Sequence, residues 1–149
     1  MQKRIEELLS ESGETLINLD LTSNPNVQEI KEFPSNSFKN YTRLVCLNLT
    51  NFLQLEKIGY DSFKNSWSLQ EIQFSLNLKE ISSGSFQNCT SLVRLDFSSC
   101  EELELISFDT FTDAWLLEEI RFPSNIKEIR SGAFHNCTKL VRLDFSNCA

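Results

Sequence analysis

The chain has 149 residues, 40% of them hydrophobic, which is the composition of a globular protein with room for one sizeable core. Its formal net charge of −7 predicts no nucleic-acid partner, because clustered Lys and Arg supply most of the affinity for phosphate backbones. No apolar run reaches the roughly 18 residues that a membrane-spanning helix needs, so we expect no membrane insertion.

The sequence carries no enzyme signature. With 4 Gly and 1 His it has no Gly-rich phosphate loop and no G-x-S-x-G motif, and His135 has no identifiable Cys or Ser partner. The 5 Cys are odd in number and never spaced as C-x-x-C, which indicates reduced thiols rather than a disulfide frame or a metal site. We therefore expect no catalytic residue, no metal and no cofactor.

Residues 1–15 predict an N-terminal capping helix. Met1, Ile5, Leu8 and Leu9 fall on one helical stripe with charged residues around it. Such a helix would cover the open first unit of a repeat array, and the alternative is a partner-binding or coiled-coil helix. The segment lacks the apolar core of a signal peptide, so the chain as given is expected to be cytoplasmic.

A repeat follows. Residues 69–91 return as residues 117–139 with 14 of 23 positions identical, and residues 92–100 return as residues 140–148 at the same offset of 48. A fixed offset of this length is typical of a solenoid or another repeat architecture. The repeat domain, residues 16–149, divides into six coils, the last of them partial, that begin at Leu16, Leu44, Leu69, Leu92, Leu117 and Leu140.

Each coil opens with apolar residues at positions one, four and six, which alternate with polar residues as in a strand with one buried face. An apolar pair spaced by three follows, and a Phe comes five residues later, as in Leu78, Ile81 and Phe86. In the first coil the corresponding step, from Ile30 to Phe38, is eight residues. We therefore expect a three-residue insertion around Phe33 to loop out there.

The fifth coil contains the residues of a known repeat unit: Leu117, Ile120, Phe122, Pro123, Ile126, Ile129, Ala133, Phe134 and Cys137. This pattern resembles the BspA-like (Treponema pallidum-type) leucine-rich repeats, although coils two and four lack the Pro and carry Ser66 and Ala114 in place of the Cys. The resemblance implies an α/β-type repeat fold: a right-handed, curved leucine-rich-repeat solenoid with one parallel sheet of about six strands and short helical turns opposite. It also implies adhesion or protein binding without catalytic residues, and a location at the cell surface instead of the cytoplasm if this chain is a fragment of a typical family member.

Stacking the coils places strand positions three and five in two rows that face outward. Charge alternates along the first row over four coils, so neighbouring pairs such as Glu71 and Arg94 can form cross-strand ion pairs. The rows are either a solvated ladder that fixes the register or the face that binds a protein partner. The candidate partner-binding residues are Glu71, Gln73, Arg94, Asp96, Glu119, Arg121, Arg142 and Asp144.

The C-terminal coil suggests an alternative function. The chain stops in mid-coil, which would leave Leu140, Leu143 and Phe145 at an open end. Either the array continues in a longer protein, or a second copy covers this end and the chain is a self-assembling homo-oligomer.

Two further features remain open. Cys46 should lie exposed on the strand face, which makes it the candidate reactive thiol. Trp67 and Trp115 occupy equivalent positions two coils apart, either packing beside the longer coils or forming an aromatic contact patch.

Overall fold

A computed structural model describes residues 18–20 and 25–148. The predicted capping helix, residues 1–15, lies outside the described residues. One side of the molecule carries a short strand from every coil, at positions three to five as predicted. These strands are β1 (Asn18–Asp20), β3 (Cys46–Asn48), β5 (Glu71–Gln73), β7 (Arg94–Asp96), β9 (Glu119–Arg121) and β11 (Arg142–Asp144).

The opposite side is also a parallel sheet, which corrects the expected helical turns. Its five strands, in the spatial order of the coils, are β2 (Glu32–Phe33), β4 (Lys57–Ile58), β6 (Glu80–Ile81), β8 (Leu105–Ile106) and β10 (Glu128–Ile129). Within the described ranges the one helix is a 3-10 helix, η1 (Pro25–Glu29). Backbone groups here bond from coil to coil, as Ser82 N donates to Ile58 O at 2.9 Å, and need no helical turn to satisfy them.

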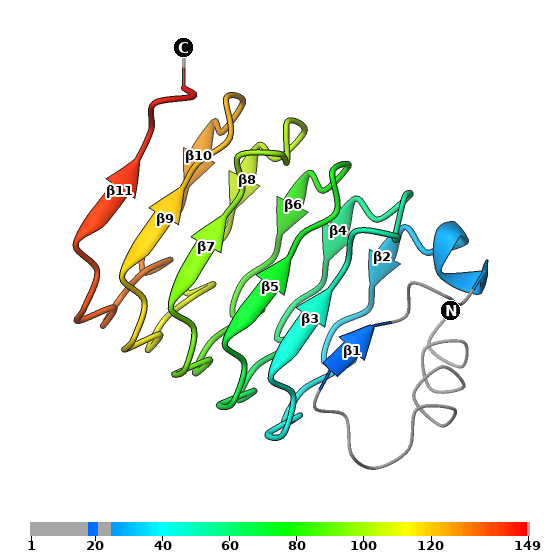
Figure 1. Ribbon diagram of the computed structural model, residues 1–149, viewed down its shortest axis with the longest axis horizontal. Helices are drawn as coiled ribbons and strands as arrows, with labels where there is room; N and C mark the ends of the chain where they lie inside the picture. Colours follow the sequence, from blue (N-terminus) through cyan, green and yellow to red (C-terminus); the bar gives the residue numbers. More distant parts are fainter. Residues whose placement is uncertain (1–17, 21–24, 149) are drawn as a thin grey trace.

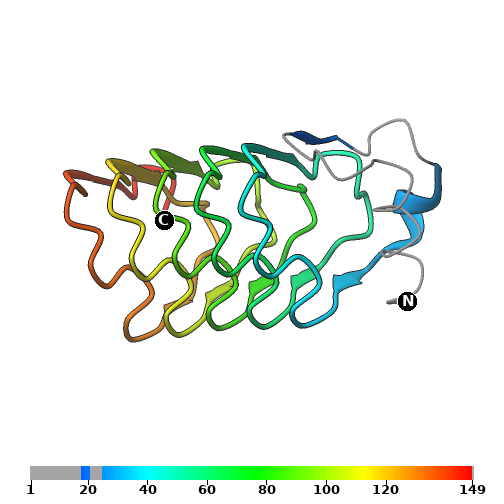
Figure 2. The same ribbon diagram turned by 90° about the horizontal axis from the view of Figure 1, so that it is seen from below.

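The coils stack in chain order, and the two sets of strands form two layers (Figures 1 and 2). The buried apolar side chains of the coils form one continuous core cluster. The Phe that each coil was predicted to place in the core forms a continuous stack: Phe38, Phe63, Phe86, Phe111 and Phe134. Neighbouring ring centroids lie 4.8 to 5.5 Å apart, and the rings are within 3° of parallel. The first four rings are fully buried, so this position requires a large apolar side chain.

The first coil does not loop out at Phe33, and that prediction was wrong. Phe33 pairs in register with Ile58 and is fully buried. The pair that matches the other coils is therefore Ile30 and Phe33, and Phe33 precedes Phe38 by the usual five residues. The extra residues lie earlier in the coil, where the structure has the helix η1.

Two columns of left-handed residues turn the chain in each coil. Their φ angles range from 53 to 73°, a region that Gly, Asn and Asp enter most easily. The first column is Asn36, Asp61, Gly84, Asp109 and Gly132, and the second is Asn40, Asn65, Asn88, Asp113 and Asn136.

The first column follows the two-coil repeat of the sequence over its last four members. A Cβ atom on Gly84 would lie 2.3 Å from the Asp61 Oδ1 atom, and one on Gly132 would lie 2.1 Å from Asp109 Oδ1. Each Asp side chain therefore occupies the space beside the Gly of the following coil. From Asp61 to Gly132, Asp and Gly alternate along the stack, in step with the 48-residue repeat, whereas Asn36 and Asp61 in the first two coils both carry side chains.

The strands on the first side do not form one continuous sheet. Backbone pairing joins β1, β3 and β5 into one sheet and β7, β9 and β11 into another. The expected sheet of about six strands therefore has the right strands but is divided between β5 and β7. The far-side sheet is continuous across the same two coils, since β6 pairs with β8.

Candidate partner-binding face

The outward side chains of β3 to β11 form a polar surface, which we name the outer face. It consists of Cys46, Asn48, Glu71, Gln73, Arg94, Asp96, Glu119, Arg121, Arg142 and Asp144. In β3 to β9 the middle residue of each strand is buried and its two neighbours point outward, because successive side chains of a strand alternate between its faces.

Three arginines converge on Glu119 at one end of the outer face. A Glu119 carboxylate oxygen lies 3.1 Å from Arg121 Nε, 3.5 Å from Arg142 Nε and 3.8 Å from Arg94 Nε. The predicted cross-strand pairs of Glu119 with Arg94 and Arg142 therefore form. Arg121 also pairs with Asp96 at 3.6 Å, and Arg142 also pairs with Asp144 at 3.4 Å. Arg94 makes the longest of the three contacts with Glu119, so its guanidinium keeps the most hydrogen-bonding capacity toward a ligand.

The charges and hydrogen bonds of the outer face change the pKa values of two of its residues, Arg121 and Asp144. The hydrogen bond and the charge of Glu119, with a smaller contribution from Asp96, raise the pKa of Arg121. Hydrogen bonds from the Ser146 side chain and backbone, followed by the charge of Arg142, lower the pKa of Asp144. Both groups stay ionised at neutral pH, so the outer face presents fixed charges of both signs.

Position five has a structural role in alternate coils. The side-chain oxygens of Asn48, Asp96 and Asp144 accept hydrogen bonds from the backbone N–H two residues later, at 3.0, 2.9 and 2.9 Å. This arrangement is an Asx turn, and it closes the longer turn of these coils. Asp96 and Asp144 are thus partly committed to their own turns.

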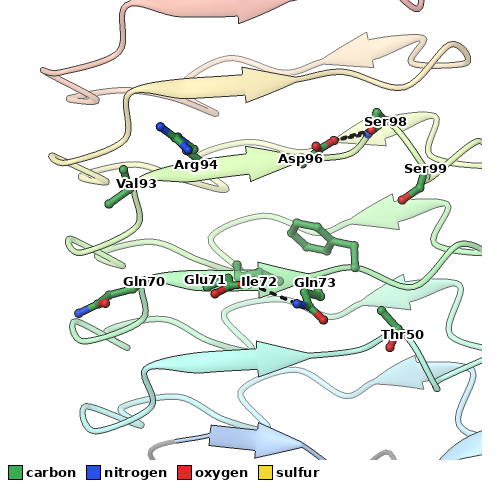
Figure 3. Close-up of a pocket in the computed structure, with 11 residues that line it drawn as sticks. Thr50, Gln70, Glu71, Ile72, Gln73, Val93, Arg94, Asp96, Ser98 and Ser99 are labelled. Carbon is green, nitrogen blue, oxygen red and sulfur yellow. Dashed lines mark hydrogen bonds between the residues drawn. The ribbon is translucent and has the colours of Figure 1, made fainter.

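Glu71 and Arg94 face one another across the divide between β5 and β7 without forming the predicted ion pair. Glu71 instead accepts a hydrogen bond from Gln73 Nε2 at 3.2 Å. The space between the strands is a groove of about 680 Å³, shown in Figure 3. It is lined by Thr50, Gln70, Glu71, Ile72, Gln73, Phe74, Val93, Arg94, Asp96, Ser98 and Ser99.

Sequence reasoning missed this groove. Glu71 and Arg94 have the same pattern as Glu119 and Arg142, which do approach one another. The charges at strand position three therefore do not distinguish the divided pair of strands from the closed ones. At position five the closed β7–β9 pair has an ion pair between Asp96 and Arg121, whereas β5 has the neutral Gln73.

The remaining candidates lie apart from these features. Cys46 is half-buried on β3, opposite Glu71, rather than fully exposed. Leu140 is half-buried, while Leu143 and Phe145 are 52% and 45% exposed. Trp67 and Trp115 are both 53% exposed, so neither is a core residue.

Two kinds of feature are absent from the described residues. In this part of the chain no group of three or more His, Cys, Asp or Glu is placed to hold a metal ion. Among the same residues no helix is long and apolar enough to cross a membrane.

Comparison with known proteins identifies the repeat. The family model of the BspA type leucine rich repeat region matches residues 14–148 in six copies. The leucine-rich-repeat protein of Treponema pallidum is 29% identical, with a TM-score of 0.68 over 74% of this chain and 50% of that one. A leucine-rich cell surface protein of Faecalibacterium prausnitzii is 28% identical, with a TM-score of 0.70 over 77% of this chain and 29% of that one.

This chain thus spans half or less of the two solved relatives. No curated protein is significantly similar to it in sequence. The family match covers nearly all of the chain and agrees with the six strand-bearing coils of the structure. The chain belongs to the BspA-type leucine-rich-repeat family.

Proposed function

We propose that this chain is a non-enzymatic binding module that presents its outer face to a protein partner, as in cell adhesion. The observation that carries the proposal is the cluster of Arg94, Arg121 and Arg142 around Glu119 on that face, in which Arg94 is the most exposed. The Arg94 side chain is 73% exposed and lies 3.8 Å from its nearest anionic partner, so it can exchange that partner for a carboxylate of a ligand.

The family supports this proposal in general terms. Leucine-rich-repeat proteins commonly act as protein-interaction modules, and solenoids use their extended sheet surfaces for binding. One similar structure is that of a cell surface protein. An adhesive module needs polar groups in fixed positions and does not need reactive groups. The strands of the outer face hold side chains of positive and negative charge in such fixed positions.

Charge reversal tests the face. We expect Arg94→Glu together with Arg142→Glu to abolish capture of partner proteins in pull-downs from extracts of the source cells and of cells it contacts. Lys79→Glu together with Lys127→Glu is the matched control, because it makes the same charge change beside Glu56 and Glu104, before β6 and β10 on the opposite side. Circular dichroism and thermal melting confirm folding of each variant.

One result would contradict the assignment of the outer face as the binding surface. If the folded double variant captures the same proteins in the same amounts as the wild-type chain, the binding surface lies elsewhere. Loss of capture in the control variant with Lys79 and Lys127 reversed would point to a general effect of net charge rather than to this face.

A second candidate function is self-association through the last coil. Leu143 and Phe145 are 52% and 45% exposed and Leu140 is half-buried, whereas the equivalent Leu95 and Phe97 are at most 1% exposed. Exposed apolar side chains of this kind can be covered by a second copy of the chain. Light scattering across a range of concentrations tests it, with Leu143→Glu as the variant that should disperse any oligomer. A wild-type monomer at high concentration would reject self-association.

A further inference from the structure

The groove between β5 and β7 exists because two neighbouring strands lack the backbone bonds that join the others on this side. Pairing is found between β1 and β3, β3 and β5, β7 and β9, and β9 and β11. No ladder joins β5 to β7 in the part of the chain that the structure describes. Figure 3 shows these two strands farther apart than either is from its other neighbour.

The open edge of β5 follows from its pairing on the other side. Glu71 N donates to Val45 O at 3.3 Å, so Glu71 directs its backbone groups toward β3. Because backbone groups alternate along a strand, Ile72 and Phe74 direct theirs toward the groove.

The open edge of β7 follows in the same way. Val93 O accepts a hydrogen bond from Glu118 N at 2.9 Å, so Val93 faces β9. Arg94 and Asp96 therefore direct their backbone N–H and C=O groups toward the groove. Two unpaired strand edges thus face one another, and each is a template for a further strand.

The floor of the groove exposes part of the core. Ile72 is 7% and Phe74 is 4% exposed, whereas the equivalent residues of the adjacent coil, Leu95 and Phe97, are at most 1% exposed. An apolar side chain seated in the groove would cover these two residues. The groove therefore combines an apolar floor with polar backbone walls.

The far side of the molecule holds the two coils together. Ser107 N donates to Ile81 O at 3.0 Å, and the Phe86 and Phe111 rings stack with centroids 5.3 Å apart. The outer side can therefore widen about this far-side contact. Cα atoms of β5 and β7 still come within 8 Å of one another, and an inserted strand needs about twice the usual 4.8 Å spacing. No ladder joins the strands, so the widening breaks no backbone pairing. It separates the Phe74 and Phe97 rings, whose centroids lie 4.6 Å apart, and an apolar side chain of the inserted strand would take the place between them.

We propose that this groove binds an extended segment of a protein partner, which pairs its backbone with the open edges of β5 and β7. The proposal rests on the proposed function and specifies its ligand: a peptide strand with an apolar side chain for Ile72 and Phe74. Glu71 and Arg94 stand on opposite walls without pairing, so they favour a basic side chain on the β5 side and an acidic one on the β7 side.

The first measurement uses hydrogen exchange in the free chain. The amides of Ile72, Phe74, Arg94 and Asp96 should exchange much faster than that of Leu95, which lies in the paired β7–β9 ladder. Equal protection of these amides would show that the sheet closes in solution and would overturn the proposal.

The second measurement uses a phage-displayed library of random linear peptides selected on the immobilised wild-type chain. A selected peptide should slow exchange at the four groove amides.

The closing variant is Gln73→Cys with Asp96→Cys in a Cys46→Ser background, where a disulfide between the introduced thiols draws β5 to β7. Oxidation should weaken peptide binding at least about tenfold, and dithiothreitol should restore it.

A matched staple controls for the disulfide itself. Arg121 and Asp144 are register partners in the closed β9–β11 ladder, so Arg121→Cys with Asp144→Cys should leave peptide affinity independent of oxidation. Two results would overturn the groove proposal and leave the proposed function standing. The selected peptides could bind without protecting the groove amides, or their affinity could stay the same when the disulfide between β5 and β7 forms.

Two other outcomes would also overturn the proposal that the groove binds a peptide strand. Recovery of no peptide overturns the groove, while the charge-reversal pull-down, which uses no peptide, still judges the outer face on its own. Protection of the groove amides by dimerisation of the free chain would identify a second copy as the occupant and overturn the proposal.

Discussion

At the scale of single residues, one core position, three residues after the stacked Phe, differs between coils in whether its side chain has a hydrogen-bond partner. Cys89 and Cys137 each direct the thiol to the backbone carbonyl of a stacked Phe of the preceding coil, Sγ to O 3.4 Å in both cases. Ser66 occupies the same position, is fully buried, and its Oγ atom has no hydrogen-bond partner. Ala114 fills this position in another coil with no polar atom to satisfy.

We therefore expect Ser66→Ala to stabilise the protein. A buried hydroxyl without a partner costs about 1–3 kcal/mol of desolvation, so its removal should raise the free energy of unfolding by about 1 kcal/mol. Urea denaturation measures the change. Ser62→Ala is the control, because the buried Ser62 Oγ donates to Gly59 O at 2.7 Å and its loss should lower stability. A lower stability of the Ser66 variant would contradict this account.

At the scale of the repeated elements, side-chain ladders join the coils. Asn65 Nδ2 donates to Asn40 Oδ1, and Asn88 Nδ2 donates to Asn65 Oδ1, both at 2.8 Å. Asn136 Nδ2 likewise donates to Asp113 Oδ1 at 2.9 Å. The ladder stops between coils three and four, because the Asp113 carboxylate has no N–H to offer to Asn88.

Asp113→Asn should complete this ladder and stabilise the protein by about 0.5–1.5 kcal/mol. The new amide can donate to Asn88 Oδ1 while its own oxygen still accepts from Asn136, and Asn tolerates the left-handed φ of 64° at this position. Thermal melting against the wild-type chain measures the gain. Asp113→Ala separates the two effects, since it removes the carboxylate without adding a donor, and an equal gain there would exclude the ladder as the cause.

The aromatic stack predicts graded effects along the coils. Phe86 is fully buried and stacked on both sides, so Phe86→Ala should lower the free energy of unfolding by about 3–5 kcal/mol. Phe134 is half-buried, so Phe134→Ala should cost less. Urea denaturation of both variants gives the two values. A cost near zero at both positions would contradict the assignment of the core.

At the scale of the whole molecule, the sequence predicted the parts of the fold that depend on spacing. The positions of the strands and the stack of Phe rings follow from the constant sequence spacing between the apolar residues of each coil. The first coil was misassigned because Val27, Ile30 and Phe33 offer two pairs spaced by three, and only coil-to-coil register selects Ile30 and Phe33.

The divide between β5 and β7 was unpredictable for a different reason. It depends on how neighbouring coils pack in three dimensions. The Phe74 and Phe97 rings beneath it are tilted by 35°, whereas those of Phe122 and Phe145 beneath the closed β9–β11 ladder are tilted by 9°. Both pairs are Phe at the same strand position, so the letters alone do not separate them.

The buried thiols make the stability of the whole molecule sensitive to alkaline pH. Burial raises the pKa of Cys137 to about 11 and that of Cys100 to about 12, from an ordinary value of 9.0, and it also raises the pKa of Cys89. Above about pH 9 the unfolded chain loses these protons while the folded chain retains them. The stability that the neutral thiols contribute is therefore complete below pH 9 and is lost as pH rises toward 11 to 12.

We expect the melting temperature in the presence of a reductant to fall between about pH 8 and about pH 10. Burial also raises the pKa of Tyr41, which acts in the same direction, so the wild-type chain alone does not isolate the thiols. Cys89→Ala together with Cys100→Ala lowers stability at both pH values but removes two of the titrating groups. The fall between the two pH values should thus be smaller in this variant than in the wild-type chain, and an equal fall would show that the buried thiols do not set the alkaline limit.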